Sequence, residues 1–212
     1  MKITLQVGID PASMTDAAAI VGTLHYKPTS EGDVDGLSPK TVMALEIPPP
    51  GDAEKALEVL LEKCSKIVGL KQSIGCDRMM FVIDGTGIGN EQYARLRGKL
   101  PNLKKINIHG NSKDGVIRKK SEKDAYAWSK HDMILTKRRM RYLCKVTNQG
   151  AGPRLRDQIR DYKEREIPGT NGQLTGEGRP DDLLMAWLLS LAHIPSQGAT
   201  YHPDAGRWLI PR

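Results

Sequence analysis

The amino-acid sequence predicts an α/β protein built around a mixed β-sheet. Two observations predict this class. Three strand-like runs come first with only turns or loops between them, and the later strands alternate with helices. Hairpins join antiparallel strands, whereas a strand–helix–strand crossover joins parallel ones. The chain has 212 residues, of which 39% are hydrophobic, and this length suits one domain with its own core.

The first three strands are expected within residues 4–9, 17–24 and 40–47. The first of them ends at Asp10, because Pro11 restricts the residue before it to extended geometry. The short segment 11–16 then makes a hairpin of the first two strands. The polar segment 27–38 reads as a loop, and three consecutive prolines stop the third strand.

A helix opens at Asp52, after which apolar residues recur at helical spacing. Residues 79–83 form a continuous apolar run, typical of a strand buried on both faces, which ends at Asp84. A helix follows the glycine-rich segment 85–89, and residues 104–109 suit a fifth strand. This order describes an RNase H-like fold with the first strand central, beside the fourth; a plain dinucleotide-binding fold would alternate from the start.

The C-terminal part of the chain is harder to interpret. We expect a helical stretch within 121–133, either helix or strand within 154–165, a loop or tight hairpin within 168–178, and a helix from the Asp181–Asp182 pair to about His193. We expect one domain over residues 1–194 and a loose tail over 195–212.

The charge distribution indicates a polyanionic partner. The chain carries a net charge of +7, but between Lys113 and Arg165 there are 16 basic and 7 acidic residues, a local charge of +9. A basic block on a balanced body favours nucleic acid, with a solvated helical face as the alternative. Candidate DNA contacts in this block are Lys119, Lys120, Arg138, Arg139 and Arg141.

Cysteine usage and hydropathy exclude several classes of protein. The three cysteines are odd in number and show no C-x-x-C spacing, which argues against a disulfide framework or a zinc finger and suits a reducing cytoplasm. No N-terminal signal is visible. The longest weakly polar run, Leu183–Ile194, is too short to span a bilayer, so no membrane association is expected.

Four carboxylates are candidate catalytic and metal-binding residues: Asp10, Asp84, Asp181 and Asp182. The first two end strands that we expect to be parallel neighbours, so both project at one edge of the sheet. The pair begins an apolar helix that must pack on the sheet, which can bring it to the same edge. Clustered carboxylates repel unless a cation neutralises them, and hard oxygen ligands select Mg²⁺ or Mn²⁺. Two such ions can hydrolyse a phosphodiester.

Each of these acids also has a structural interpretation. Asp10 before Pro11 and Asp84 before Gly85 are common turn formers, and the late pair can cap its helix. Their joint occurrence, with the matching strand order, favours the metal site. Within the pair, we take Asp181 as the first choice of ligand, with Asp182 assisting.

Three motifs together resemble the nuclease domain of the tailed-phage large terminase: Val7–Ala12, Val82–Gly89 and Gly178–Ala186. The resemblance implies an RNase H-like, two-metal endonuclease that cuts concatemeric viral DNA during genome packaging. The acidic triad of the family maps onto Asp10, Asp84 and the Asp181/Asp182 pair. The first motif is shared with RuvC-type resolvases, so a Holliday junction resolvase is the alternative function. A non-catalytic nucleic-acid-binding or protein-docking module is a third possibility.

The resemblance also implies partners and a location. These are double-stranded DNA, a terminase ATPase domain, the small terminase subunit and the portal, in the host cytoplasm. The sequence has no G-x-x-x-x-G-K-[ST] motif, so we expect an isolated nuclease domain without its own ATPase motor.

Overall fold

The structure is a computed structural model that describes residues 2–11, 16–27, 39–49, 51–106, 145–161, 164–166, 174–176, 182–191, 200–202 and 207–209. Its centre is a six-stranded sheet in the order β5-β4-β1-β2-β3-β6. The strands are β1 (Lys2–Asp10), β2 (Ala18–Lys27), β3 (Lys40–Ile47), β4 (Arg78–Asp84), β5 (Leu103–Ile106) and β6 (Lys145–Val146). The helices are α1 (Ala53–Gly69), α2 (Lys71–Ile74), α3 (Ile88–Leu96), α6 (Gly152–Asp161) and α7 (Asp182–Leu191).

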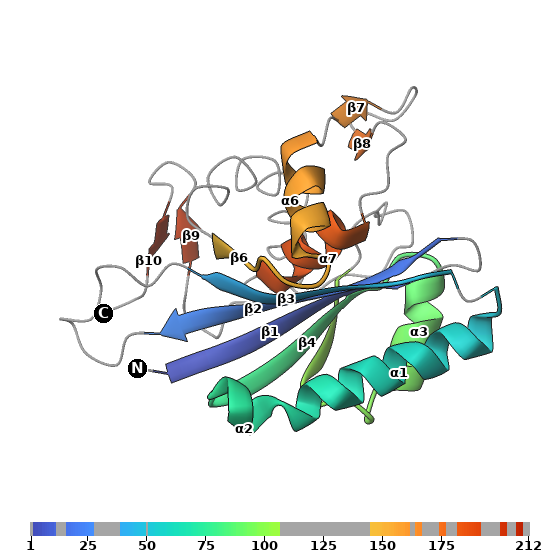
Figure 1. The fold of residues 1–212 in the computed structure, drawn as a ribbon, viewed down its shortest axis with the longest axis horizontal. Coiled ribbons are helices and arrows are strands. Elements are labelled where there is room, and N and C mark those ends of the chain that lie inside the picture. Colours follow the sequence, from blue (N-terminus) through green and yellow to red (C-terminus); the bar gives the residue numbers. More distant parts are fainter. Residues whose placement is uncertain are drawn as a thin grey trace.

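The predicted fold class is confirmed by the strand order and directions. β1, β2 and β3 pair antiparallel in sequence, whereas β1 pairs parallel with β4, and β4 with β5. β1 therefore lies inside the sheet beside the fourth strand, as expected for an RNase H-like fold. Helices α1 and α3 cover one face of the sheet, and α6 and α7 lie on the other (Figure 1).

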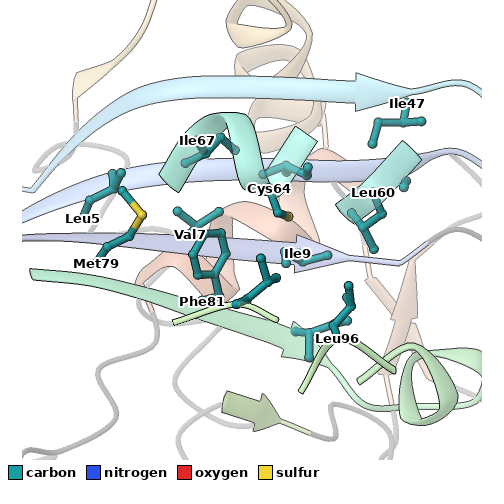
Figure 2. Packing of buried hydrophobic residues seen from close by; sticks show 14 of the residues in the cluster. Leu5, Val7, Ile9, Ile47, Leu60, Cys64, Ile67, Met79, Phe81 and Leu96 are labelled. Carbon is teal, nitrogen blue, oxygen red and sulfur yellow. The ribbon is translucent and has the colours of Figure 1, made fainter. Parts of the chain in front are cut away.

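The face toward α1 holds the larger apolar core. Alternate residues of β1, Leu5, Val7 and Ile9, are fully buried there beneath Leu60 and Cys64 of α1 (Figure 2). Burial raises the pKa of the Cys64 thiol to about 12, so this cysteine is an uncharged core residue. The helix itself is capped by Asp52, whose carboxylate accepts the N–H groups of the second and third helical residues at 2.8 and 3.0 Å.

The face toward α7 is held by buried hydrogen bonds as well as by apolar contact. The Thr23 hydroxyl lies 2.7 Å from that of Ser190 and 3.1 Å from that of Thr41. Thr41 also accepts the indole N–H of Trp187 at 3.0 Å. These bonds link α7 to β2 and β3, so they fix where the helix sits on the sheet.

Several segments differ from the sequence expectation or decide between alternatives. Residues 152–161 are helix α6, not a strand, because Leu155 and Ile159 are spaced to bury one helical face. Strands β7 (Glu164–Glu166) and β8 (Leu174–Gly176) pair antiparallel, which favours the tight hairpin. The expected fifth strand starts one residue earlier, at Leu103, and ends at Ile106 within the described residues. The helix expected within 121–133 lies outside them.

The expected loose tail contains two short strands, β9 (Thr200–His202) and β10 (Arg207–Leu209), paired antiparallel. Tyr201 and Trp208 are partners in this register. Aromatic residues favour strands, and the prediction of a loose tail gave this preference too little weight. The division into residues 1–194 and 195–212 stays a prediction. Among the helices of the described part, none has the length and apolarity needed to cross a bilayer.

Candidate active site

Asp10 and Asp84 lie side by side at one edge of the sheet. They are the last residues of β1 and β4, which are parallel neighbours in the register Gly8 with Val82 and Ile9 with Ile83. The next position in this register brings the two aspartates to the same level, where neighbouring strands are about 4.8 Å apart. The predicted parallel pairing of these two strands is thus confirmed.

The two aspartates also share a face of the sheet. Successive side chains on a strand point to opposite faces. Ile9 and Ile83 belong to the core under α1, whereas Gly8 and Val82 contact residues of α7. By this alternation, Asp10 and Asp84 are on the α7 face. Two carboxylates placed in this way repel each other unless positive charge or protons intervene.

The carboxylate of Asp84 is held by the residue two positions later. Its Oδ1 accepts the backbone N–H of Thr86 at 2.8 Å and the Thr86 hydroxyl at 2.7 Å, and the residue is only 9% exposed. The structural interpretation of Asp84 as a turn former is therefore correct. The turn also fixes the orientation of the carboxyl group, so the two interpretations are compatible.

The glycines after Asp84 serve close packing. A Cβ on Gly89 would lie 1.9 Å from the Asp84 carbonyl oxygen and 2.9 Å from Cγ of Pro11. The first turn of α3 thus presses against the ends of both β4 and β1. Gly87 has a φ of +56°, a conformation that favours glycine. These contacts explain the glycine pattern through backbone packing around the two aspartates.

Helix α7 lies directly on β1 and runs antiparallel to it. The Gln6 amide donates to the Leu189 carbonyl at 2.8 Å. Two residues further along the strand, a Cβ on Gly8 would lie 1.9 Å from the Ala186 carbonyl oxygen. As β1 advances, the residues contacted on α7 therefore move back toward its N-terminus, so α7 begins over the carboxyl end of β1.

Asp182 is the first residue of α7 and lies on this edge. One helical turn separates it from Ala186, about 6 Å along the axis, and Asp10 is about 7 Å beyond Gly8 along the strand. Asp182 is partly buried. The N-terminal end of the helix dipole also favours negative charge here.

Within the described residues, no three Asp, Glu, His or Cys side chains are grouped closely enough to hold a metal ion. Asp10, Asp84 and Asp182 therefore do not form such a group within the part of the chain that the structure describes. Asp181, the preferred member of the pair, lies outside the described residues. So do all the candidate DNA contacts, Lys119, Lys120, Arg138, Arg139 and Arg141.

Two residues near this edge escaped the sequence reasoning. Thr86 orients Asp84, and the spacing Asp-Gly-Thr is a signal for such a turn. Gln158 on α6 accepts the Leu184 N–H in the first turn of α7 at 2.9 Å. No sequence pattern identifies Gln158, because a single hydrogen bond between residues far apart in the chain produces no periodic pattern in the sequence.

Comparisons with known proteins find proteins that resemble this chain in structure but none that match it in sequence. In sequence, the chain matches no protein-family model and no curated protein. It is similar to the large terminase nuclease from thermophilic phage G20c in a magnesium-bound crystal structure, with 13% identity, a TM-score of 0.49, and coverage of 90% of this chain and 80% of that one. A second structure of that nuclease gives 12% identity, a TM-score of 0.48, and coverage of 90% and 82%.

A member of the Ppx/GppA family from Aquifex aeolicus is also similar, with 11% identity, a TM-score of 0.35, and coverage of 64% of this chain and 40% of that one. The chain is similar in fold to the large terminase nuclease, the family that its three sequence motifs resemble.

Proposed function

We propose that this chain is a metal-dependent DNA endonuclease that hydrolyses phosphodiester bonds at the edge formed by Asp10, Asp84 and the start of α7. The observation that supports this most is the register of β1 and β4, which sets two aspartates at one level on one face. Two adjacent acids at the carboxyl edge of an α/β sheet stand where such folds place their sites.

The donor chemistry of this edge fits a divalent cation. Carboxylate oxygens are hard ligands, which suit Mg²⁺ or Mn²⁺ better than zinc. We propose that Asp10, Asp84 and the Asp181/Asp182 pair hold two such ions. Divalent ions at a site of this kind supply water activation and leaving-group stabilisation in phosphodiester hydrolysis.

The chain's own residues prepare this edge in three ways. Thr86 fixes the Asp84 carboxyl group through two hydrogen bonds, so little reorganisation accompanies binding. Gly8 allows the backbone of α7 to approach β1, and in our proposal this approach brings Asp182 to the edge. The basic block between Lys113 and Arg165 supplies the grip on the DNA backbone, with contacts to phosphates dominating over contacts to bases.

The wider role follows the family that the motifs resemble. We propose that the substrate is double-stranded, concatemeric viral DNA in the host cytoplasm, cut during genome packaging. A terminase ATPase domain, the small terminase subunit and the portal would be its partners. Such a nuclease cuts DNA without ATP.

The proposal is tested by incubating the chain with plasmid DNA and Mn²⁺ or Mg²⁺. We expect the wild type to nick and linearise the plasmid. Asp84→Asn keeps an oxygen that accepts the bonds from Thr86 but removes the charge, and it should lower the rate at least about 100-fold, the upper end of what changes in the outer shell of a metal site cost. Asp10→Asn should do the same.

The matched control is Asp52→Asn, since asparagine caps a helix as well as aspartate does and Asp52 begins a helix on the other face. It should cut like the wild type. Undiminished cutting by the Asp10→Asn/Asp84→Asn double variant would contradict the assignment. A strong preference for four-way junctions over linear duplex would reassign the chain to the resolvases, and salt-sensitive binding without cutting would indicate a non-catalytic module.

A further inference from the structure

The first turn of α7 is held by a side chain from another helix. The opening N–H groups of any helix lack partners within the helix. In α7, the N–H of Leu184, the third helical residue, donates to Oε1 of Gln158 at 2.9 Å. Gln158 belongs to α6, 26 positions earlier in the chain.

This bond bears on how the first turn of α7 is capped. A capping aspartate just before a helix accepts the N–H of the second or third helical residue, as Asp52 does for α1. For α7 these donors are Leu183 and Leu184, and Gln158 already occupies the second of them. The cap is thus supplied in part by the side-chain amide of Gln158, which carries no charge.

Gln158 is itself well anchored. Its neighbours Leu155 and Ile159 are buried in the same cluster as Leu183 and Trp187 of α7. At the start of α6, the Ala151 N–H donates to the Ala44 carbonyl of β3 at 3.0 Å. A continuous path of packed residues therefore runs from the sheet through α6 to the first turn of α7, and α6 lies against α7 (Figure 1).

We propose that Gln158 is a positioning residue for the acidic edge, by which we mean the sheet edge at Asp10 and Asp84 together with Asp182. By holding the Leu184 N–H, Gln158 would fix the first turn of α7 and so the place of Asp182 relative to the two strand ends. This inference rests on the proposed function. Partners that orient metal ligands affect metal affinity although they touch no metal. Gln158 would act in this way through the helix rather than through a ligand side chain.

The test measures Mn²⁺ binding to the DNA-free protein by calorimetry, together with the Mn²⁺ concentration that gives half-maximal cutting. Gln158→Leu removes the acceptor but keeps the bulk. We expect Mn²⁺ affinity to fall about tenfold, and the rate at saturating Mn²⁺ to fall much less. Hydrogen exchange at the Leu184 amide should accelerate.

Two further variants separate positioning from packing. Gln158→Glu restores an acceptor oxygen, so Mn²⁺ affinity should return toward the wild-type value; a role in packing alone predicts that leucine is tolerated and glutamate is not. Gln6→Leu removes a comparable bond at the other end of α7. That end is also held by Thr23 and by His25, whose Nε2 lies 2.7 Å from the Ser190 carbonyl, so Gln6→Leu should leave Mn²⁺ affinity unchanged.

The outcomes distinguish this inference from the function it rests on. If the wild type binds Mn²⁺ and cuts DNA, but Gln158→Leu binds Mn²⁺ equally well, the positioning role is wrong and the nuclease assignment stands. Equal weakening by Gln6→Leu also overturns it, because the effect is then a general loosening of α7. A wild type that neither binds Mn²⁺ nor cuts DNA overturns both.

Discussion

The two faces of the central sheet are built on different principles. Toward α1, the strands present large apolar side chains such as Leu5, Val7 and Phe81, all fully buried. Toward α7, apolar residues such as Val21 and Val82 are accompanied by Gln6, Gly8 and Thr23, which are polar or lack a side chain. One face is a conventional apolar core, whereas the other combines apolar burial with buried hydrogen bonds and with a helix backbone in direct contact with the sheet.

The difference shows how this fold separates stability from position. Apolar burial is non-directional and roughly proportional to area, so it stabilises many similar arrangements. Hydrogen bonds have fixed geometry, and an unpaired buried polar group is costly, so the α7 face accepts one arrangement. The acidic edge lies on that face, where two aspartates and a helix start must keep their spacing.

The largest expected effect comes from the α1 face. Leu60→Ala leaves a cavity among buried residues of α1, β1 and β4 and should lower the free energy of unfolding by roughly 3–4 kcal/mol. Urea denaturation measures the loss. Below the unfolding transition, Mn²⁺ affinity should equal that of the wild type. A large change in Mn²⁺ affinity would show that the two faces are not independent.

The strands and helices that could be predicted from the sequence are those whose residues follow a regular hydrophobic pattern. Alternation and turn residues located β1 to β3, and the apolar run before Asp84 located β4, so the meeting of Asp10 and Asp84 followed from strand order. The helical nature of α6 stayed undecided, because its few apolar residues gave a weak signal in a charged segment. The close approach at Gly8 was not anticipated, since a glycine inside an apolar strand looks alike whether or not a helix rests on it.

The second prediction concerns that close approach. Gly8→Ala places a methyl group 1.9 Å from the Ala186 carbonyl oxygen and 2.5 Å from the Ser190 nitrogen. Both are backbone atoms, so α7 must move, and we expect a loss of about 2–3 kcal/mol in unfolding free energy. Unlike Leu60→Ala, this variant should also weaken Mn²⁺ binding and slow DNA cutting in the folded protein.

Gly22 on β2 provides the control for this variant. A Cβ there would lie 2.6 Å from Cγ of Met43, a flexible side chain that can rotate away. Gly22→Ala should therefore cost clearly less stability than Gly8→Ala and leave Mn²⁺ binding intact. If Gly8→Ala cost no more stability than Gly22→Ala and left Mn²⁺ binding intact, α7 would tolerate the added methyl group and Gly8 would have no special role.

The smallest expected effect tests the hydrogen bonds of the α7 face directly. Thr41→Val keeps the shape of the side chain but removes the acceptor of the buried Trp187 N–H, so we expect a loss of about 1–2 kcal/mol. Thr41→Ser keeps the hydroxyl and should retain that bond, as judged by the hydrogen exchange of the indole proton. Because Trp187 is one turn beyond Leu183, loss of its hydrogen bond should loosen mainly the middle of α7.

The affinity for Mn²⁺ should therefore change less in Thr41→Val than in Gly8→Ala. If Thr41→Val weakened Mn²⁺ binding more than Gly8→Ala does, the hydroxyl bonds, rather than the close backbone contact, would set the position of the acidic edge.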